Sequence, residues 1–456
     1  MQNTTFNYLF TACIQLLMLS LLPFTTLGNT DKPNHDLAQL VGAYHEVYDF
    51  SGTVMVVENE QVEFLTSYGL ASRELNIPLT PQHRNSINSI SKTFTAVSIM
   101  ILVEQGKLDL HAPASAYLPE MKASWKNEVT IHQLLTHTSG LPREAGIEQH
   151  SEMSFKEQID NLVVGLIPSK TEKKTYQYSN AGVILLGAIV EAVSKQSFNA
   201  FVEQQIIKPL KLKNTGLYKS KAIVPSQATP YRMTADGIAH AQRSKHFGDS
   251  AGGGMYSTVE DLYTFVLAIE NNSLLSEKSK NLMLHPHVAS GQSDSEGYLW
   301  SLKSFGGENL LFAAGSGYGT KSVFIRMPES KDFIAITSNW GNTPILPMLR
   351  DIYLLSRGKK VEAPTTDNLA NAQRYSKHLG DYLFNAEQLQ QQLGVNSGKL
   401  RLHAVNGKLF LDDELLTQQT VNNLGLTYTA EVTIQLPSTT QMLININGNK
   451  LLGTKI

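Results

Sequence analysis

The sequence predicts an α+β protein in which an antiparallel sheet packs with a helical cluster, followed by a small C-terminal antiparallel β domain. Three observations predict this fold class. Strand-like segments stand at both ends of the first part of the chain, helix-like segments lie between them, and the chain from about residue 365 is rich in strand-like segments. This order favours a sheet that is built from both ends and covered by the helices.

The first strand-like segment, residues 52–72, predicts a hairpin. Its sequence is GTVMVVENEQVEFLTSYGLAS, which alternates and carries β-branched residues on both sides of a polar turn at Glu58 to Gln61. Alternation on either side of a short polar turn is typical of two antiparallel strands.

Helix-like segments follow the hairpin. Residues from Ile90 to Gln105 are apolar on nearly every face, and Gly106 is a natural C-terminal cap, so we expect a helix buried inside a large domain. Another helix with a broad apolar face begins at Asn180. Residue pairs three apart predict further capped helix starts. These pairs are Thr130 with Gln133, Ser154 with Glu157, and Ser257 with Glu260.

Strands return at KSVFIRM and DFIAITSNW, and a polar, proline-containing linker follows near VEAPTTDNLANAQ. Beyond the linker, alternating segments flank Asn406-Gly407 and Asn447-Gly448, which are two-residue hairpin signals. We therefore predict one domain over residues 33–358 and a small β-rich domain over residues 365–456.

The first 28 residues predict a secretory signal peptide, because an apolar run from Tyr8 to Phe24 ends in small residues before a polar stretch. An uncleaved N-terminal membrane anchor is the alternative. Either reading predicts an exported protein, periplasmic or secreted, with membrane contact only through an uncleaved leader.

Composition excludes several classes of partner. The net charge is −2, from 38 basic and 40 acidic side chains, and no basic run favours nucleic acid. The single cysteine, Cys13, excludes an internal disulfide framework, and neither C-x-x-C nor H-E-x-x-H spacing occurs. We therefore expect no metal site.

The segment SISK places Ser89 and Lys92 three residues apart at the start of the first buried helix. Positions i and i+3 share a helix face, so the amine lies beside the hydroxyl. A buried amine favours its neutral form, which can take a proton from serine, and the N–H of Ser89 at the helix start suits a developing negative charge. The simpler interpretation is that Ser89 caps the helix and Lys92 extends to solvent.

A second candidate element is the tripeptide YSN, with Tyr178 and Asn180 just before the second apolar helix. The phenol can move a proton between the serine and a leaving group, and the carboxamide can orient a substrate amide. The simpler interpretation makes Asn180 an N-cap and Tyr178 a packed aromatic residue. A glycine-rich strand entrance, LLFAAGSGYGTKSVFIRMPE, allows close backbone approach to a ligand.

Together these segments resemble the serine β-lactamase and penicillin-binding protein superfamily, especially its class C β-lactamase, D,D-peptidase and esterase branch. SISKTFTA matches the S-x-x-K motif and YSN the Y-x-N motif. The segments VTIHQLLTHTSGLP, LVEQGKLDL and AGGGMYSTVEDLYTF also resemble recurring parts of that superfamily, and the likeness covers about Glu46 to Asn342. The resemblance implies a β-lactamase/transpeptidase-like domain and no cofactor.

The resemblance also implies roles for individual residues. Ser89 would be the acylated nucleophile, Lys92 its proton partner, Tyr178 the general base and acid, and Asn180 a substrate-amide contact. The third motif is best placed at Ala313-Ala314-Gly315, with the N–H of Ser316 as second oxyanion donor.

That third motif departs from the superfamily pattern, because Ala313 stands where relatives carry Lys or His. A cation there would hold a substrate carboxylate. Its loss favours neutral ester or amide substrates over β-lactams that bear a carboxylate. Lys321 is an alternative cation, although an exposed strand lysine is the simpler interpretation.

The resemblance implies an exported serine hydrolase that acts on an ester or amide carbonyl, peptide or β-lactam-like, through an acyl-enzyme at Ser89. Its substrate would be a small molecule or peptide, with the cell wall as one source. The alternative is a penicillin-binding-like ligand-binding or sensor protein with little turnover. The C-terminal β domain resembles lipocalin-like modules, which shape the site entrance, bind a partner or pack as an accessory.

Overall fold

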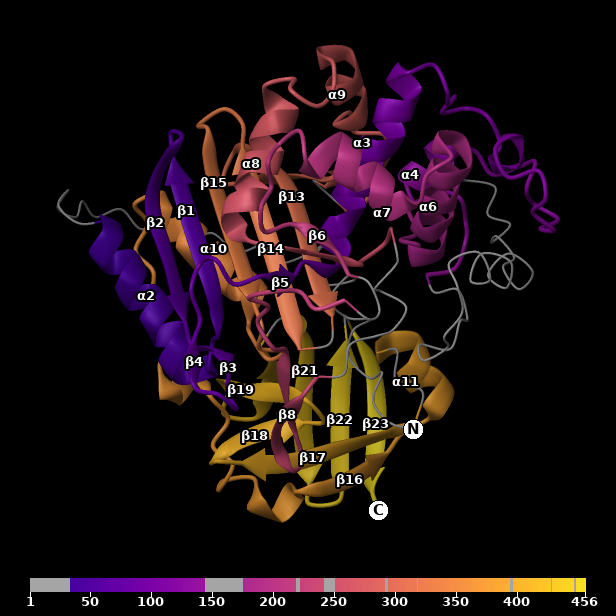
Figure 1. Ribbon diagram of the computed structural model, residues 1–456. Helices are drawn as coiled ribbons and strands as arrows, with labels where there is room; N and C mark the ends of the chain where they lie inside the picture. The colour runs from indigo at the N-terminus through magenta and orange to yellow at the C-terminus, as the bar shows by residue number, and fades with distance from the viewer. Residues whose placement is uncertain are drawn as a thin grey trace.

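An eight-stranded antiparallel sheet forms the centre of the first domain, and a closed eight-stranded antiparallel barrel forms the second (Figure 1). The computed structural model describes residues 33–143, 175–218, 222–241, 251–291, 294–317, 319–393, 397–427, 429–446 and 448–456. The predicted leader and the predicted cap at Ser154 and Glu157 lie outside the described residues. The predicted fold class is confirmed.

The central sheet has the strand order β10-β11-β12-β13-β14-β15-β1-β2. Its strands are β1 Gly52–Glu58, β2 Gln61–Tyr68, β10 Val288–Ala289, β11 Ser295–Glu296, β12 Ser301–Phe305, β13 Glu308–Gly317, β14 Thr320–Met327 and β15 Asp332–Ser338. The predicted hairpin is β1 and β2, and β1 pairs with β15 so that Gly52 lies opposite Ser338. The sheet is therefore built from both ends of the domain, as the sequence predicted.

Helices cover both faces of this sheet. They are α2 Pro33–Tyr48, α3 Ser91–Glu104, α4 Ile131–Leu135, α6 Asn180–Ser194, α7 Phe198–Val202, α8 Val259–Glu270, α9 Glu277–Met283 and α10 Ile345–Ser356, with a π-helical turn at Glu203–Ile207. Residues of α3, α4, α6, α7, α8 and α9 share one apolar cluster, and residues of α2 and α10 share a second cluster on the other face. The central strands β1, β14 and β15 are therefore buried between two layers of helices.

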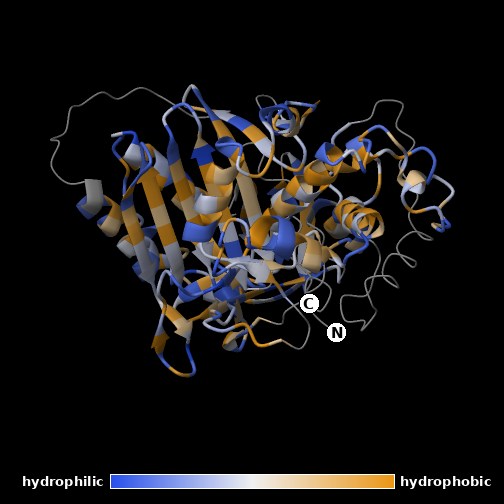
Figure 2. Ribbon diagram, turned by 45° about the horizontal axis from the view of Figure 1, so that its top comes forward, coloured by the Kyte–Doolittle hydropathy of each residue, from blue (hydrophilic) through white to orange (hydrophobic). Residues whose placement is uncertain are grey.

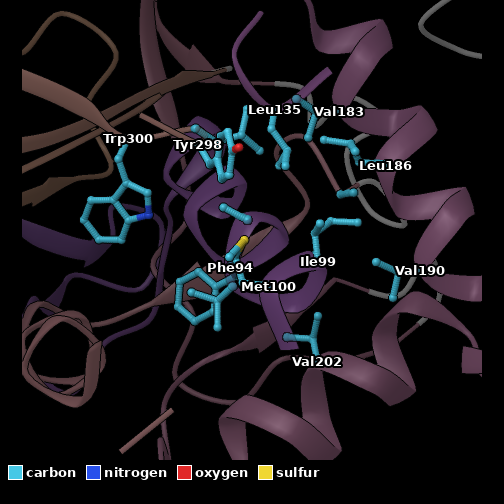
Figure 3. Packing of buried hydrophobic residues seen from close by; sticks show 14 of the residues in the cluster. Phe94, Ile99, Met100, Leu135, Val183, Leu186, Val190, Val202, Tyr298 and Trp300 are labelled. Carbon is cyan, nitrogen blue, oxygen red and sulfur yellow. The ribbon is translucent and has the colours of Figure 1, made fainter. Parts of the chain in front are cut away.

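Helix α3 runs through the middle of the first cluster, as the sequence predicted for Ile90 to Gln105. A 3₁₀ turn, Asn88–Ile90, precedes it, and Gly106 follows it with φ of +66°. Only glycine adopts that left-handed conformation without steric cost, which ends the helix there. Figure 3 shows its side chains Phe94, Ile99 and Met100 surrounded by Leu135, Val183, Leu186, Val190 and Val202.

One predicted helix cap lies as expected and one is displaced by one residue. Thr130 and Gln133 form the predicted reciprocal cap of α4. The cap of α8 is Thr258, whose side chain accepts from the N–H of Asp261, and the prediction of Ser257 was wrong by one residue. Ser257 ends strand β9, Met255–Ser257, and its hydroxyl instead lies 2.7 Å from that of Thr215.

Short strands complete the first domain. They are β3 Leu70–Ser72, β4 Ile77–Pro78, β5 Asn85–Ser86, β6 Gly216–Leu217, β7 Tyr231–Thr234 and β8 Gly237–His240. In Figure 2, hydrophobic residues follow the central strands and the helices beside them, whereas hydrophilic residues gather at the peripheral turns. Among the described helices, none alone has the length and apolar content of a membrane span, and only the bent pair Asn180–Ser194 and Phe198–Ile207 meets that test jointly.

The second domain is the closed barrel. Its strands are β16 Gly380–Leu383, β17 Lys399–Val405, β18 Lys408–Leu411, β19 Glu414–Thr420, β20 Asn423–Leu426, β21 Thr429–Ser438, β22 Gln441–Ile446 and β23 Asn449–Lys455, with α11, Ala386–Leu393, after β16. Asn406 and Gly407 form the predicted turn, with φ of +51° and +78°. Buried leucine, isoleucine, valine and aromatic side chains form the barrel's own apolar cluster, and an eight-stranded barrel is just narrow enough for side chains to fill.

Candidate active site

Ser89 lies in the 3₁₀ turn that leads into α3, and its hydroxyl is the point where three elements meet. Lys92 Nζ donates to Ser89 Oγ across 3.0 Å, and Tyr178 Oη donates to the same oxygen across 3.0 Å. The N-cap residue of α3 is Ile90, and no side chain makes a capping hydrogen bond there, so Ser89 is not the N-cap. Lys92 is only 3% exposed, so it does not extend to solvent. The structure contradicts both simpler interpretations.

The ammonium group of Lys92 is held by a segment far away in the sequence. Lys92 Nζ also donates to Gly252 O at 2.5 Å. The residues beside Gly252 are fixed to the same helix, because Thr95 Oγ1 donates to Ala251 O and Met255 N–H donates to Ser91 Oγ. A buried lysine costs several kcal/mol unless polar partners compensate it, and this carbonyl together with Ser89 supplies them.

Tyr178 is placed by the segment that precedes α6. Ser179, not Asn180, caps this helix: its hydroxyl accepts from Gly182 N–H at 3.0 Å and donates to Pro142 O at 2.8 Å. The interpretation of Asn180 as an N-cap is therefore wrong. Asn180 is instead the first residue of α6, two residues after Tyr178, and is 9% exposed.

His137 holds the tyrosine segment in place, and sequence analysis did not single it out. Its ring lies 4.6 Å from the Tyr178 ring, its Nδ1 accepts from Ser179 N–H at 3.2 Å, and its carbonyl accepts from Gln177 N–H. Burial, with smaller effects from Lys92 and Arg143, lowers the pKa of His137 to about 3. The imidazole is therefore neutral near pH 7, and Nδ1 is its acceptor atom.

A second cation faces the phenol from the chain segment after α4. The guanidinium of Arg143 lies 4.9 Å from the centre of the Tyr178 ring, and Lys92 Nζ lies 5.1 Å from it. The carbonyl of Arg143 accepts from Asn180 N–H at 2.8 Å, which ties this residue to the start of α6. Two positive charges against one ring suit a reaction in which negative charge develops nearby.

The end of β13 forms the opposite side of the site. A Cβ added to Gly315 would lie 2.1 Å from Ile87 O and 2.9 Å from Ser89 N, so only glycine lets this strand approach the turn that carries Ser89. The last β13 residue paired with β12 is Phe312, so the strand runs past its neighbour beside Ser89. Ser316 follows Gly315 on this stretch, which pairs with β14 but not with β12, at the position that the sequence predicted for a second oxyanion donor.

Ala313 lies two residues before Gly315 and therefore on the same face of β13. It is buried in the apolar cluster that contains Phe324, its cross-strand partner, and Trp300. Apolar side chains therefore surround the strand position at which superfamily relatives carry Lys or His.

Lys321 does not replace that missing cation, and the interpretation of an exposed strand lysine is also wrong. Lys321 is only 5% exposed. Its neighbours Ser322 and Phe324 face the Ser89 side of β14, whereas Val323 belongs to the apolar cluster on the opposite face. Side chains alternate along a strand, so Lys321 points away from the site.

The described stretches contain no group of three or more His, Cys, Asp or Glu side chains arranged to hold a metal ion. The groups that the structure brings to Ser89 Oγ are the amine of Lys92 and the phenol of Tyr178, which are of the kinds that exchange protons with a hydroxyl.

This geometry agrees with the comparisons with known proteins. The model of the family described as Beta-lactamase matches residues 37–355, which is more than half of the chain. This chain belongs to the β-lactamase family. Within it, the putative penicillin-binding protein PbpX of Bacillus subtilis (strain 168) is 28% identical over 260 residues, covering 56% of this chain and 64% of PbpX. The chain thus spans less than two thirds of that relative's length.

Solved structures show the same fold. A penicillin-binding protein from Bacillus halodurans has a TM-score of 0.62 and 27% identity, covering 69% of this chain and 99% of that one. An octameric penicillin-binding protein homologue from Pyrococcus abyssi has a TM-score of 0.62 and 22% identity, covering 92% and 99%. The likeness to β-lactamases and penicillin-binding proteins that the sequence predicted is confirmed.

Proposed function

We propose that the protein is a serine hydrolase that attacks an ester or amide carbonyl through an acyl-enzyme at Ser89. The observation that carries this proposal is the convergence on one oxygen: Lys92 Nζ and Tyr178 Oη each lie 3.0 Å from Ser89 Oγ. A serine hydroxyl is a weak nucleophile unless an adjacent base accepts its proton. Two such groups stand within hydrogen-bond reach, which is the geometric requirement for a general base.

Acylation then proceeds in two balanced steps. In the reactive protonation state Tyr178 or Lys92 has lost its proton and accepts the one on Ser89 Oγ, while that oxygen forms a bond to the substrate carbonyl carbon. The carbonyl π electrons move to oxygen. When the tetrahedral species collapses, the bond to the leaving alcohol or amine breaks, and the protonated base returns the proton to the leaving group. Water repeats the sequence to release the acid and free Ser89.

Two backbone donors support the negative oxygen in this proposal. Ser89 N–H belongs to the turn that leads into α3, where orphan donors and the helix dipole favour negative charge. We assign the second donor to Ser316 N–H, because Gly315 brings the end of β13 against Ser89. Asn180, at the start of α6, is the proposed contact for a substrate amide.

The substrate class follows from the wall at Ala313. A carboxylate placed against Ala313, Phe324 and Trp300 would lose its hydration without gaining a cation. We therefore propose a neutral ester or amide, or a peptide that lacks an anchoring carboxylate, as the preferred substrate. Vigorous turnover of β-lactams is not expected. Export remains part of the proposal and rests on the leader sequence over residues 1–28.

The test is intact-mass spectrometry of the purified protein after exposure to a fluorophosphonate and, separately, to a penicillin, with Ser89→Ala as control. A fluorophosphonate adduct that the wild type forms and Ser89→Ala lacks would support the nucleophile. An undiminished adduct in Ser89→Ala would refute it. Parallel assays with a short-chain nitrophenyl ester, a D-Ala-D-Ala peptide and a chromogenic cephalosporin rank the substrate classes, and we expect the ester to be turned over fastest.

The ligand-binding or sensor alternative makes a different prediction in the same experiment. The apolar wall at Ala313 favours it, because relatives carry a Lys or His at that position. Stoichiometric labelling of Ser89 with negligible turnover of all three substrates would establish a binder instead of a hydrolase.

A further inference from the structure

Asn88, the residue before the candidate nucleophile, has an unusual backbone conformation. Its φ is +47°, in the left-handed region, although it is not a glycine. Asparagine tolerates this region better than most residues, but the right-handed conformation is still the more favourable one. Residues in this region persist where the surrounding contacts fix them, and they gather at functional sites. The contacts of Asn88 therefore decide how firmly the turn that carries Ser89 is held.

The carboxamide of Asn88 is buried and joins three segments of the first domain. Asn88 is 8% exposed. Its Nδ2 donates to Thr320 Oγ1 at the start of β14 across 3.0 Å, and its Oδ1 accepts from Ser86 Oγ of β5 across 3.1 Å. On β13, a Cβ added to Gly317 would lie 2.8 Å from Asn88 Cγ, so the carboxamide packs directly against the backbone of that strand. One side chain thus ties β5, β13 and β14 together.

These contacts lie next to both proposed oxyanion donors. Ser89 follows Asn88 in the turn, and Ser316 precedes Gly317 on β13. Gly317 and Thr320 form the last pair of the β13–β14 ladder, so the carboxamide of Asn88 contacts both members of one pair. The contact between Asn88 and Gly317 therefore limits how far the two donor N–H groups can move apart.

We infer that Asn88 is a positioning residue that holds the N–H groups of Ser89 and Ser316 toward one point, where the oxyanion develops. Its backbone supplies the left-handed turn, and its side chain fastens that turn to the β13–β14 hairpin. The inference rests on the proposed function, because an oxyanion forms only if Ser89 is acylated. Its structural part, a looser join between the turn and the hairpin when the carboxamide is removed, is independent of any reaction.

Substitutions separate the backbone contribution from that of the side chain. Glycine at position 88 keeps the left-handed conformation but removes the carboxamide, whereas alanine removes both. Thr320→Val removes the oxygen that accepts from Asn88 Nδ2. Asn76→Gly is the matched control, because Asn76 also has a left-handed backbone, with φ of +50°, but lies exposed between β3 and β4.

The test measures fluorophosphonate labelling of Ser89 and steady-state turnover of the short-chain nitrophenyl ester by the full-length protein. We expect Asn88→Gly to label about 10- to 100-fold more slowly than wild type, because misplaced donors stabilise the transition state less. Its kcat should fall by a similar factor with little change in KM, since the oxyanion is present in the transition state and not in the bound ester. Asn88→Ala should label no faster than Asn88→Gly, and Asn76→Gly should match wild type.

A double variant tests whether the side chain acts through β14. Thr320→Val should slow labelling, and Asn88→Gly combined with Thr320→Val should be no slower than Asn88→Gly, because both substitutions break the same contact. Hydrogen exchange of peptides covering residues 86–91 and 315–322 should be faster in Asn88→Gly than in wild type and unchanged in Asn76→Gly.

The inference is overturned if Asn88→Gly labels at the wild-type rate, if its loss lies in KM alone, or if Asn76→Gly slows labelling equally. Asn88→Gly decides the question alone if Asn88→Ala fails to fold, because glycine adopts the left-handed conformation without steric cost. Absence of a fluorophosphonate label on Ser89 in wild type refutes the proposed function instead. Hydrogen exchange then decides the structural part: faster exchange in Asn88→Gly supports it, and unchanged exchange refutes it.

Discussion

Two buried lysines sit on opposite sides of the same β-strand layer, and they are held in different ways. Lys92 is 3% exposed and donates to a serine hydroxyl and a backbone carbonyl. Lys321 is 5% exposed, and the charge of Glu414 in the barrel acts against the fall that burial causes in its pKa. Lys92 therefore has the contacts that the proposed proton transfer requires. Burial lowers the pKa of Lys321 and so weakens its ammonium form.

The comparison teaches that burial alone does not identify a reactive lysine. The partners decide. The hydroxyl of Ser89 lies 3.0 Å from the amine of Lys92 and is its partner in the proposed proton transfer, whereas Lys321 lies on the face of β14 that points away from Ser89. Substitutions at the Ser89 site and on the opposite face of the sheet test this distinction.

The largest effect is expected from Lys92→Met. Removing the amine deletes one of the two groups that we propose exchange a proton with Ser89, and such groups contribute about 10²- to 10⁴-fold to rate. The rate of fluorophosphonate labelling measures the loss, with Lys321→Met as the comparison on the other face. A Lys92→Met protein that labels more than a tenth as fast as wild type would show that Tyr178 alone activates the serine.

Next in size is Gly315→Ala. The new methyl group would lie 2.1 Å from Ile87 O, so β13 must move away from Ser89 and the proposed second oxyanion donor moves with it. Loss of one such donor costs about 10²- to 10³-fold. Gly42→Ala is the control, because its methyl group would meet no atom within 4 Å. Equal labelling rates in the two variants would place the oxyanion elsewhere.

Phe410→Ala breaks the domain interface instead of the site. This side chain is 1% exposed and packs in the apolar cluster shared with the central sheet. Truncating a buried phenylalanine costs about 3–5 kcal/mol of unfolding free energy. Urea denaturation measures it, and labelling of Ser89 should slow in parallel because the barrel no longer supports β14. Unchanged labelling in a destabilised protein would show that docking and catalysis are independent.

The smallest expected effects are on the pH dependence of the unfolding free energy, which His137 and Glu414 change in opposite directions. His137 has a folded-state pKa of about 3, below its ordinary value, so the unfolded chain binds the extra proton and stability falls as the pH drops below about 6.5. Glu414 has a folded-state pKa of about 7, above its ordinary value, so its contribution is full below about pH 4.5 and is lost as the pH rises through 7.

Each slope approaches about 1.4 kcal/mol per pH unit for one fully buried group. Urea denaturation of wild type, His137→Gln and Glu414→Gln between about pH 4 and pH 8 tests the assignment. His137→Gln should flatten the acid side of the stability curve and Glu414→Gln the neutral side. If His137→Gln flattened the neutral side and Glu414→Gln the acid side, the two pKa assignments would be wrong.

Local patterns predicted much of the fold and part of the site. The spacing of Ser89 and Lys92 sufficed to bring hydroxyl and amine together, because three residues along a helix return to the same face. The hairpin over residues 52–72 and the turn at Asn406-Gly407 were likewise visible, since alternation and turn chemistry act over a few residues. Tyr178 was predicted from its motif, and the structure brings it to Ser89.

Contacts between distant segments were beyond the sequence patterns. Gly252 reaches Lys92 across 160 residues, and His137 holds Ser179 across 42. Neither a lone glycine carbonyl nor a single histidine carries a periodic signal. The N-cap of α8 was predicted one residue too early, because serine and threonine both cap helices well. Ser257 belongs to strand β9, and Thr258 is the cap.

The sequence by itself determined the helix start that carries Ser89 and Lys92, the strands that surround it and the alanine in place of a cation, because each depends on residue type and short-range geometry. Only the tertiary structure decided what Lys321 does. Alternation along β14 turned this lysine to the far face, where barrel residues Phe410 and Leu415 pack in one cluster with Val323. That outcome depends on how two domains pack, and apolar packing is non-directional until the complete surfaces meet.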